Sequence, residues 1–381
     1  MGAAGPAQGA PAAHPRLVPP PGRGSNRLSP PRTGDIGEPS WDNRLRYVRS
    51  CHATYPPEAF TAYRRLGAAA SLAAGACGSS ASAPAAASGS GPELTHITVG
   101  ALAITDDAPL FIAIKKGYFT QQGLTVTTKI VPASTDAIPD MLAGSVDIIG
   151  SGNYVSFFEA ASKGVIKIDV LAAGSQCAGN TLNVLAMPKS NITSPADLAG
   201  KTIAVNLTSN IQTLTINAVL KDKGVNTAGI KYVVIPFQDM PAALVTGKVD
   251  AISVVEPFIT AAEHDGATSV LAECQGSTAG IPLGGYYATQ AWVKKYPKTA
   301  LAFRRAIDQA QATADADRAL VQQVIPTYTK ITSAIAARIS LPYYPPTLQA
   351  AQLGRVVALM RSAGMVSGSF SITPMLFRPG G

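Results

Sequence analysis

Residues 135–147 read TDAIPDMLAGSVD, and the pattern returns at residues 238–250 as QDMPAALVTGKVD. In each copy a short apolar helix runs into a glycine, Gly144 or Gly247, which can adopt the left-handed conformation that ends a helix. Val-Asp then leads into an apolar run typical of a buried strand. A polar loop follows each expected strand, at residues 151–154 and 256–258. Ligands of open α/β sheets bind beyond the carboxyl ends of strands, so two such units facing each other predict a two-lobed binding cleft.

The segments around these two copies repeat one order of elements. An expected strand at 94–103 is followed by a helix at 110–116 and a second strand, and a similar series starts at Ile203. Strands that alternate with helices predict parallel sheets covered on both faces. Apolar runs near residues 182–187 and 285–289 cross between the two series, which predicts a two-strand hinge. We therefore expect an α/β fold with two lobes. Lobe I would contain residues 94–184 and 287–381, and lobe II residues 185–286.

The charge of the chain lies mainly in its N-terminal part. The formal net charge is +8 over 381 residues, but residues 1–76 contain nine Arg and four acids, so five of the eight units lie there. The remaining Lys residues are scattered singly. A nucleic-acid partner is not indicated, because such proteins gather their basic residues on one face.

The N-terminal part has the pattern of an export signal. Residues 1–62 are rich in Pro, Gly, Ala and Arg, which predicts disorder, and residues 1–76 as a whole read as a disordered leader plus signal peptide. The sequence Ala-Gly-Ala-Cys that ends at Cys77 resembles a bacterial lipobox, although Ala74 stands where Leu is usual. That resemblance implies lipidation of Cys77, with the Ser-, Ala- and Gly-rich residues 77–93 as a flexible tether. An Ala-rich linker with an incidental Cys is the alternative.

Four motifs in order carry a resemblance to a known family. Residues 109–126 read PLFIAIKKGYFTQQGLTV, residues 142–147 LAGSVD, residues 194–205 SPADLAGKTIAV and residues 256–258 EPF. In these the chain resembles the aliphatic-sulfonate, taurine, nitrate and thiamine-precursor (SsuA/THI5-like, NMT1-like) solute-binding proteins of ABC importers. The resemblance implies a type II periplasmic-binding-protein fold that closes on a small organic solute. It also implies delivery to an ABC permease whose ATPase is a separate subunit.

The candidate ligand-binding residues lie where the expected strands end. Asp106 and Asp107 could bind a ligand amine, or serve as turn and cap residues. The stretch 206–210 offers hydroxyls, amides and backbone N–H groups at a helix start, which favours an anion, although simple N-capping is the alternative. The full set of candidates is Asp106, Asp107, Ser134, Thr135, Ser151, Gly152, Asn153, Asn206, Thr208, Ser209, Asn210, Glu256 and Tyr286.

Several of these candidates have an equally simple structural role. Glu256 begins a Glu-Pro-Phe motif that in the resembled family often serves the closed structure rather than the ligand. Tyr286 could stack on a ligand or pack in the core. Cys177 and Cys274 each come shortly before an expected hinge strand, so they are a candidate disulfide in an oxidising compartment or two buried thiols.

An enzyme on the same fold is the alternative to a binding protein. The resembled fold family includes a desulfinase and thiamine-pyrimidine synthases, which use Cys and His. Here none of His14, His52, His96 and His264 falls in an expected cleft loop, and no pair has metal-ligand spacing. We expect no catalysis, no cofactor and no metal. A purely structural surface lipoprotein is a third class, and it would not need the repeated units.

Together these patterns predict an exported, monomeric protein that is lipid-anchored to the outer face of the cell membrane. Its partners would be a small-molecule solute and the permease. The acidic candidates favour an amine-bearing or neutral heteroaromatic solute, and a taurine-like zwitterion would also fit.

Overall fold

The computed structural model describes residues 1–2 and 91–379. All described helices and strands lie between His96 and Met375. The expected leader, the signal peptide, the lipidation site Cys77 and most of the tether lie outside the described residues.

The described strands form two five-stranded sheets of matching topology. The first has the order β2-β1-β3-β10-β4 and the second the order β7-β6-β8-β5-β9. In each sheet one antiparallel strand, β10 or β5, enters a set of otherwise parallel strands. The bounds are β1 His96–Ala101, β2 Thr125–Ile130, β3 Ile148–Asn153, β4 Ile168–Ala173, β5 Leu182–Ala186, β6 Thr202–Val205, β7 Lys231–Val234, β8 Ala251–Val255, β9 Thr268–Ala272 and β10 Gly284–Thr289.

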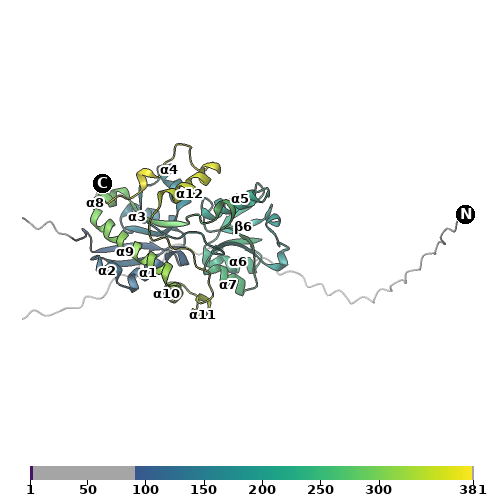
Figure 1. Cartoon of the computed structure of the whole chain (residues 1–381), viewed down its shortest axis with the longest axis horizontal. Coiled ribbons are helices and arrows are strands. Elements are labelled where there is room, and N and C mark those ends of the chain that lie inside the picture. Colours follow the sequence, from purple (N-terminus) through teal and green to yellow (C-terminus); the bar gives the residue numbers. More distant parts are fainter. Residues whose placement is uncertain (3–90, 380–381) are drawn as a thin grey trace, which may run out of the picture. The chain divides into compact units, whose positions relative to one another are not determined.

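Helices cover both sheets. Figure 1 shows α5, α6 and α7 around the second sheet, at one end of the folded body, and α1, α2, α8 and α9 around the first. Among the described helices, none has the length and apolar character needed to cross a membrane. Their bounds are α1 Ala108–Lys115, α2 Tyr118–Gln121, α3 Ile138–Ala143, α4 Tyr154–Ser162, α5 Ile211–Asp222, α6 Met240–Val245, α7 Phe258–His264, α8 Gln290–Lys295, α9 Pro297–Ala316, α10 Arg318–Val324, α11 Ser333–Ala336 and α12 Ala350–Ser362.

The sequence repeat forms the same local structure in each sheet. The helices α3 and α6 are followed by glycines with φ of 77° and 72°, as the repeat predicts. The aspartate at the end of each copy then accepts a hydrogen bond from the backbone of the equivalent strand of its sheet, β1 or β6. Asp147 accepts from the Thr98 N–H and Asp250 from the Thr202 N–H, each at 2.8 Å. The two copies are therefore equivalent positions of two related lobes.

We call the first sheet with its helices lobe I and the second sheet with its helices lobe II. The chain passes between them twice, at residues 174–181 and 273–283. These crossings come before the strands that the sequence assigned to the hinge, because β5 pairs along its whole length within lobe II and β10 within lobe I. A disulfide between Cys177 and Cys274, with a Cα–Cα distance of 5.4 Å, joins one crossing to the other.

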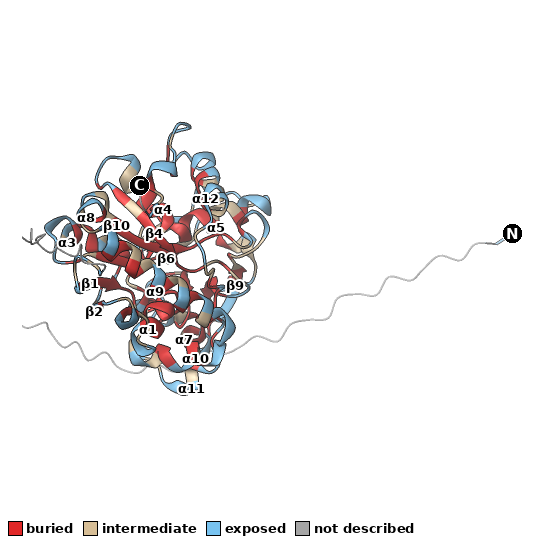
Figure 2. Ribbon diagram, turned by 60° about the vertical axis from the view of Figure 1, so that its left-hand side comes forward, coloured by how far each residue is buried: buried red, intermediate tan, exposed pale blue. Residues whose placement is uncertain are grey.

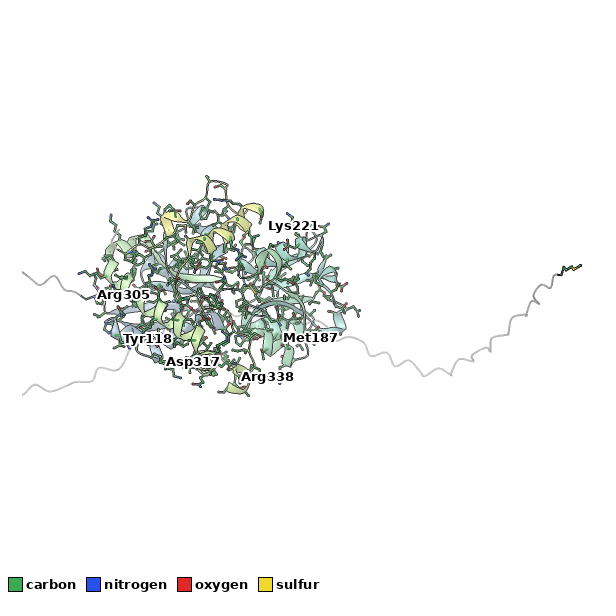
Figure 3. The ribbon with its side chains drawn as sticks, in the orientation of Figure 1. Tyr118, Met187, Lys221, Arg305, Asp317 and Arg338 are labelled. Carbon is green, nitrogen blue, oxygen red and sulfur yellow. A yellow bond between two sulfur atoms is a disulfide. The ribbon has the colours of Figure 1, made fainter. Side chains whose placement is uncertain are left out.

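The apolar core is continuous between the lobes. One hydrophobic cluster lies within lobe I, under α1 and α9, and another within lobe II, under α5. The largest cluster contains side chains of both lobes, including Leu102, Ile211 and Phe237. Figure 2 shows the buried strands enclosed by helices with exposed outer faces. Charged side chains such as Lys221 and Arg305 project from the outer surface (Figure 3).

One expected loop is wrong. Residues 151–153 are not a loop after β3 but its last part, and α4 starts directly at Tyr154. The strand is longer than its apolar run because β10 continues to pair with it, Gly284 with Asn153 and Gly285 with Gly152.

Candidate functional site

A cavity lies between the two lobes. We call it the cleft cavity. Its lining is half apolar and half polar, and none of its lining residues is Lys, Arg or His. They are Leu102, Ile104, Asp106, Ser134, Ser151, Asn153 and Leu283 from lobe I and the adjoining crossing, and Leu182, Asn206, Ile211, Gln212, Phe237 and Val255 from lobe II.

Hydrogen bonds between the lobes hold the cleft closed. The Thr105 N–H of lobe I donates to the carbonyl of Glu256 in lobe II at 3.1 Å. The Ser156 hydroxyl donates to the carbonyl of Ser209 at 2.6 Å. The Ser340 N–H donates to the Glu256 carboxylate at 3.0 Å. The cleft cavity is therefore enclosed by direct contacts between the lobes.

Lobe I presents a buried carboxyl to this cavity. Asp106 follows β1 and is only 5% exposed. It accepts hydrogen bonds from the hydroxyls of Ser175 and Thr105. Burial raises the pKa of the Asp106 carboxyl, and these two hydroxyls oppose the rise only in part. The site thus contains an acid with neutral partners only.

A second carboxyl lies next to the first but does not line the cavity. Asp107 is fully buried and accepts a hydrogen bond from the Leu102 N–H at 2.7 Å. Burial raises the pKa of Asp107 to about 7. Its Oδ1 atom and the Oγ atom of Ser151 have no hydrogen-bond partner. Ser151 does line the cavity, with a positive φ of 47° at the bulged pairing of β3 with β10.

Lobe II presents amides instead of acids. Asn210 caps α5 by accepting a hydrogen bond from the Thr213 N–H at 3.0 Å. Its side-chain nitrogen donates to Asn206 at 3.2 Å and to Gln212 at 2.6 Å. The Asn206 N–H also donates to the Gln212 side-chain oxygen, at 2.9 Å. These amides and N–H groups therefore satisfy one another at the start of α5.

The structure brings five of the sequence candidates together. Asp106, Ser134, Ser151, Asn153 and Asn206 line the cleft cavity. The others do not, and they are Asp107, Thr135, Gly152, Thr208, Ser209, Asn210, Glu256 and Tyr286.

The candidates outside the cavity have identifiable structural roles. A Cβ at Gly152 would meet the rings of Phe157 and Tyr287 at 2.8 Å, so the glycine permits core packing rather than ligand approach. Tyr286 is fully buried and packs edge-on against Phe303. Glu256 accepts hydrogen bonds from the N–H and hydroxyl of Thr260 as well as from Ser340. Thr208 lines a different groove, between α5 and α12.

Sequence reasoning missed Gln212 and every apolar residue of the lining. Gln212 is the second residue of α5, two residues after the Asn210 cap, and this position at a helix start was the signal in the sequence. The apolar residues, such as Phe237 and Leu283, carry no such signal, because in the sequence they are indistinguishable from core positions.

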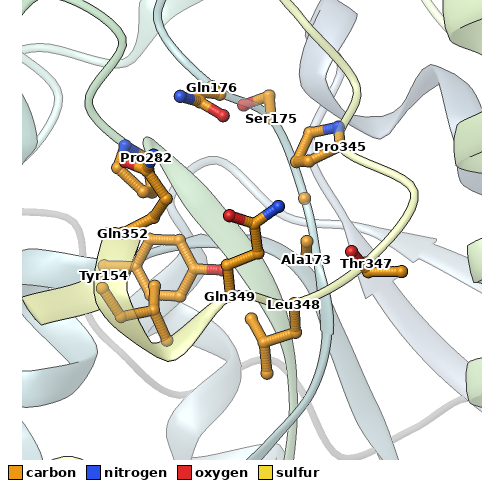
Figure 4. Close-up of a pocket in the computed structure, with 12 residues that line it drawn as sticks. Tyr154, Ala173, Ser175, Gln176, Pro282, Pro345, Thr347, Leu348, Gln349 and Gln352 are labelled. Atoms are coloured by element: carbon orange, nitrogen blue, oxygen red, sulfur yellow. The ribbon is translucent and has the colours of Figure 1, made fainter.

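A second cavity lies beside the hinge (Figure 4). We call it the hinge cavity. It is lined by both crossings, including Ser175, Gln176 and Pro282, and by the segment that leads into α12, including Gln349. Since Ser175 also donates to Asp106, the two cavities share a wall.

The described histidines lie away from both cavities. His96 and His264 are exposed, on β1 and at the end of α7. Within residues 91–379, no three or more His, Cys, Asp or Glu side chains group as metal ligands would.

A known protein family matches the part of the chain that forms this site. The family model described as NMT1/THI5 like matches residues 104–318, more than half of the chain. The chain belongs to the NMT1/THI5-like family. The match includes β3, β8, both crossings and every residue of the cleft cavity except Leu102.

Solved structures share the fold of this family member. The alkanesulfonate-binding protein SsuA from Xanthomonas axonopodis pv. citri, bound to MOPS, is 19% identical, with a TM-score of 0.63 over 75% of this chain and 99% of that one. The ligand-binding component of an ABC-type import system from Staphylococcus aureus, solved with zinc bound, is 14% identical, with a TM-score of 0.65 over 75% and 97%. The periplasmic nitrate-binding protein NrtA from Synechocystis PCC 6803 is 15% identical, with a TM-score of 0.60 over 73% and 84%. At these identities the likeness shows the periplasmic-binding-protein fold.

A curated relative from Haemophilus influenzae, named "Putative thiamine biosynthesis protein", is 26% identical over 148 residues. The match covers 39% of this chain and 45% of that protein, so the chain spans less than half of the relative's length.

Proposed function

We propose that this protein is the exported solute-binding subunit of an ABC importer, and that it captures a small organic solute by closure of its two lobes. The enclosed cavity between lobes of matching topology carries this proposal. Contacts that both lobes make with a solute favour the closed form in proportion to its higher affinity for that form. The neighbours named for alkanesulfonate, nitrate and ABC import are consistent with this function.

The proposal includes a lipid anchor on Cys77 at the outer face of the membrane and delivery of the solute to a permease. The disulfide between Cys177 and Cys274 supports export, because disulfides persist in oxidising compartments. We propose a monomer, since one chain forms both walls of the cavity.

Binding fits the cavity better than catalysis does. A serine nucleophile needs a hydrogen-bonded base, and the Ser151 hydroxyl has no partner. His96 and His264 lie on the surface. A role in making a thiamine precursor is the second candidate function, which the curated Haemophilus relative favours.

A thermal-shift screen of the full chain tests the proposal. The panel contains alkanesulfonates, nitrate, pyrimidines, amines and amino-acid-like compounds. A solute at 100 times its dissociation constant should add about 2.7 kcal/mol to the free energy of unfolding. A folded protein that no compound stabilises would contradict the proposal, and conversion of a pyrimidine precursor would favour the enzyme.

A further inference from the structure

The cleft cavity contains a carboxyl without a positive partner. No Lys, Arg or His lines the cavity, and the partners of Asp106 are hydroxyls. Arg318, whose charge acts on nearby Tyr344, donates its N–H groups to the carbonyls of Leu341 and Pro342 instead. Between residues 91 and 379 the ion pairs lie elsewhere, and they are Lys129–Asp140, Lys163–Glu159, His264–Asp265 and Arg304–Asp308.

A free hydroxyl lies in the same wall. Ser151 is 6% exposed, lines the cavity, and its Oγ atom has no hydrogen-bond partner. Buried polar atoms in native proteins are normally satisfied, and an exception calls for an explanation. The Ser151 hydroxyl acts on the Asp107 carboxyl, whose pKa it lowers, and a solute bound in the cavity would share this hydroxyl with Asp107.

The opposite wall offers little to an anion. The N–H groups of Asn206 and Thr213, at the start of α5, donate to Gln212 and Asn210. An anion that used the Asn206 or Thr213 N–H would have to displace those bonds. It would also face the Asp106 carboxyl without any cation in the lining, and its negative charge would oppose ionisation of that carboxyl.

We propose that the cleft cavity selects solutes that carry a protonated amine on an apolar body, with the ammonium group at Asp106 and Ser151. This inference rests on the proposed function and names the solute class. An ammonium group donates charge-assisted hydrogen bonds to a carboxylate and a hydroxyl, and its positive charge favours the ionised form of Asp106, whose pKa burial raises. The apolar body would lie against Leu102, Ile104, Leu182, Ile211, Phe237, Val255 and Leu283.

Three probes of similar shape and different charge test the inference. Phenethylamine, phenethyl alcohol and phenylmethanesulfonate are titrated into the full chain by isothermal calorimetry. We expect the amine to bind at least about 10-fold more tightly than the alcohol and the sulfonate, because charge-assisted bonds are the stronger ones. The ranking of the three probes on the wild-type chain does not depend on any variant.

Variants then locate the selectivity. Asp106→Asn keeps the shape and its amide oxygen still accepts from one of the two hydroxyls, so it should weaken amine binding by about 10- to 100-fold and change alcohol binding by less than about threefold. Ser151→Ala should weaken amine binding by roughly three- to tenfold. Asp140→Asn is the matched control, because it removes a carboxyl on the surface of the same lobe, paired with Lys129. It should leave all three affinities unchanged.

The outcomes separate the inference from the proposed function. If sulfonates or nitrate bind and the amine does not, the selectivity for a cation is overturned while solute binding stands. Equal loss of amine and alcohol affinity in Asp106→Asn would also overturn the inference, because the carboxyl would then act through shape. If no probe and no compound of the wider screen binds to the folded chain, both fail together.

Discussion

The two lobes share one topology but place different chemistry at equivalent positions. With Thr98 and Thr202 taken as equivalent, Asp106 of lobe I corresponds to Asn210 of lobe II. The carboxyl lines the cavity with hydroxyl partners only, while the amide caps a 12-residue helix and belongs to a closed network. With Asp147 and Asp250 taken as equivalent, Asn153 of lobe I corresponds to Glu256 of lobe II. At this pair of positions the amide is in lobe I and the acid is in lobe II.

The comparison shows that acids at the strand ends of the two lobes have different roles, one in closing the lobes and one in binding a solute. Glu256 of lobe II is surrounded by donors from its own helix and from lobe I, so its charge serves closure. Asp106 of lobe I has no backbone donor from another residue and faces the cavity, so its carboxyl is available to a solute. A charge at a strand end acts according to how completely the surrounding protein has already bonded it.

The buried acid of lobe II away from the cavity offers the largest expected effect. Glu273 is fully buried, and it accepts hydrogen bonds from Thr215 at 2.5 Å and Ser253 at 2.7 Å. Burial raises its pKa to about 8. Between its ordinary pKa and about 8 the folded chain holds a proton that the unfolded chain has lost, so stability falls as pH rises through this window.

We therefore expect Glu273→Gln to remove this part of the pH dependence. The variant should match the wild type near pH 5 and exceed it by roughly 3 kcal/mol near pH 9. Urea unfolding at a series of pH values measures the difference, with the exposed Glu263→Gln as control. A difference that does not change with pH would mean that Glu273 is charged when folded.

Removing the disulfide tests how much the connection between the two crossings contributes to the stability of the fold. Cys177 and Cys274 close a loop of 97 residues that contains most of lobe II. Replacing both with Ser should lower the free energy of unfolding by about 2 to 4 kcal/mol, because the unfolded chain regains conformational freedom. Chemical unfolding with and without reductant gives the value. Reductant should affect only the wild type, and an equal effect on the variant would contradict this origin.

The repeated aspartates give the smallest effect and the most direct comparison. Asp147 and Asp250 accept the same backbone hydrogen bond, but Asp147 also accepts one from the Trp292 indole at 2.8 Å. Asp147→Ala should therefore cost about 2 kcal/mol and Asp250→Ala about 1 kcal/mol. Unfolding curves for both variants and for Trp292→Phe measure the difference. Equal costs would show that the indole bond adds nothing to lobe I.

Local patterns in the sequence determined where helices and strands form and that the same unit occurs in both lobes. Gly144 and Gly247 end their helices because only glycine adopts a positive φ without cost. The Val-Asp pairs that follow lead into central strands because apolar runs become buried. These signals lie within a few residues of one another, so the two lobes and several cleft-lining polar residues could be predicted.

Contacts between distant residues were decided only by the tertiary structure. Asp106 lines the cavity while its neighbour Asp107 does not, although both follow the same strand. Gln212 and Phe237 reach the cavity because closure brings α5 and the end of β7 against lobe I. Residues 151–153 extend β3 because β10, more than 100 residues later in the chain, pairs with them. Such pairings depend on how the two lobes pack, and no local sequence pattern records them.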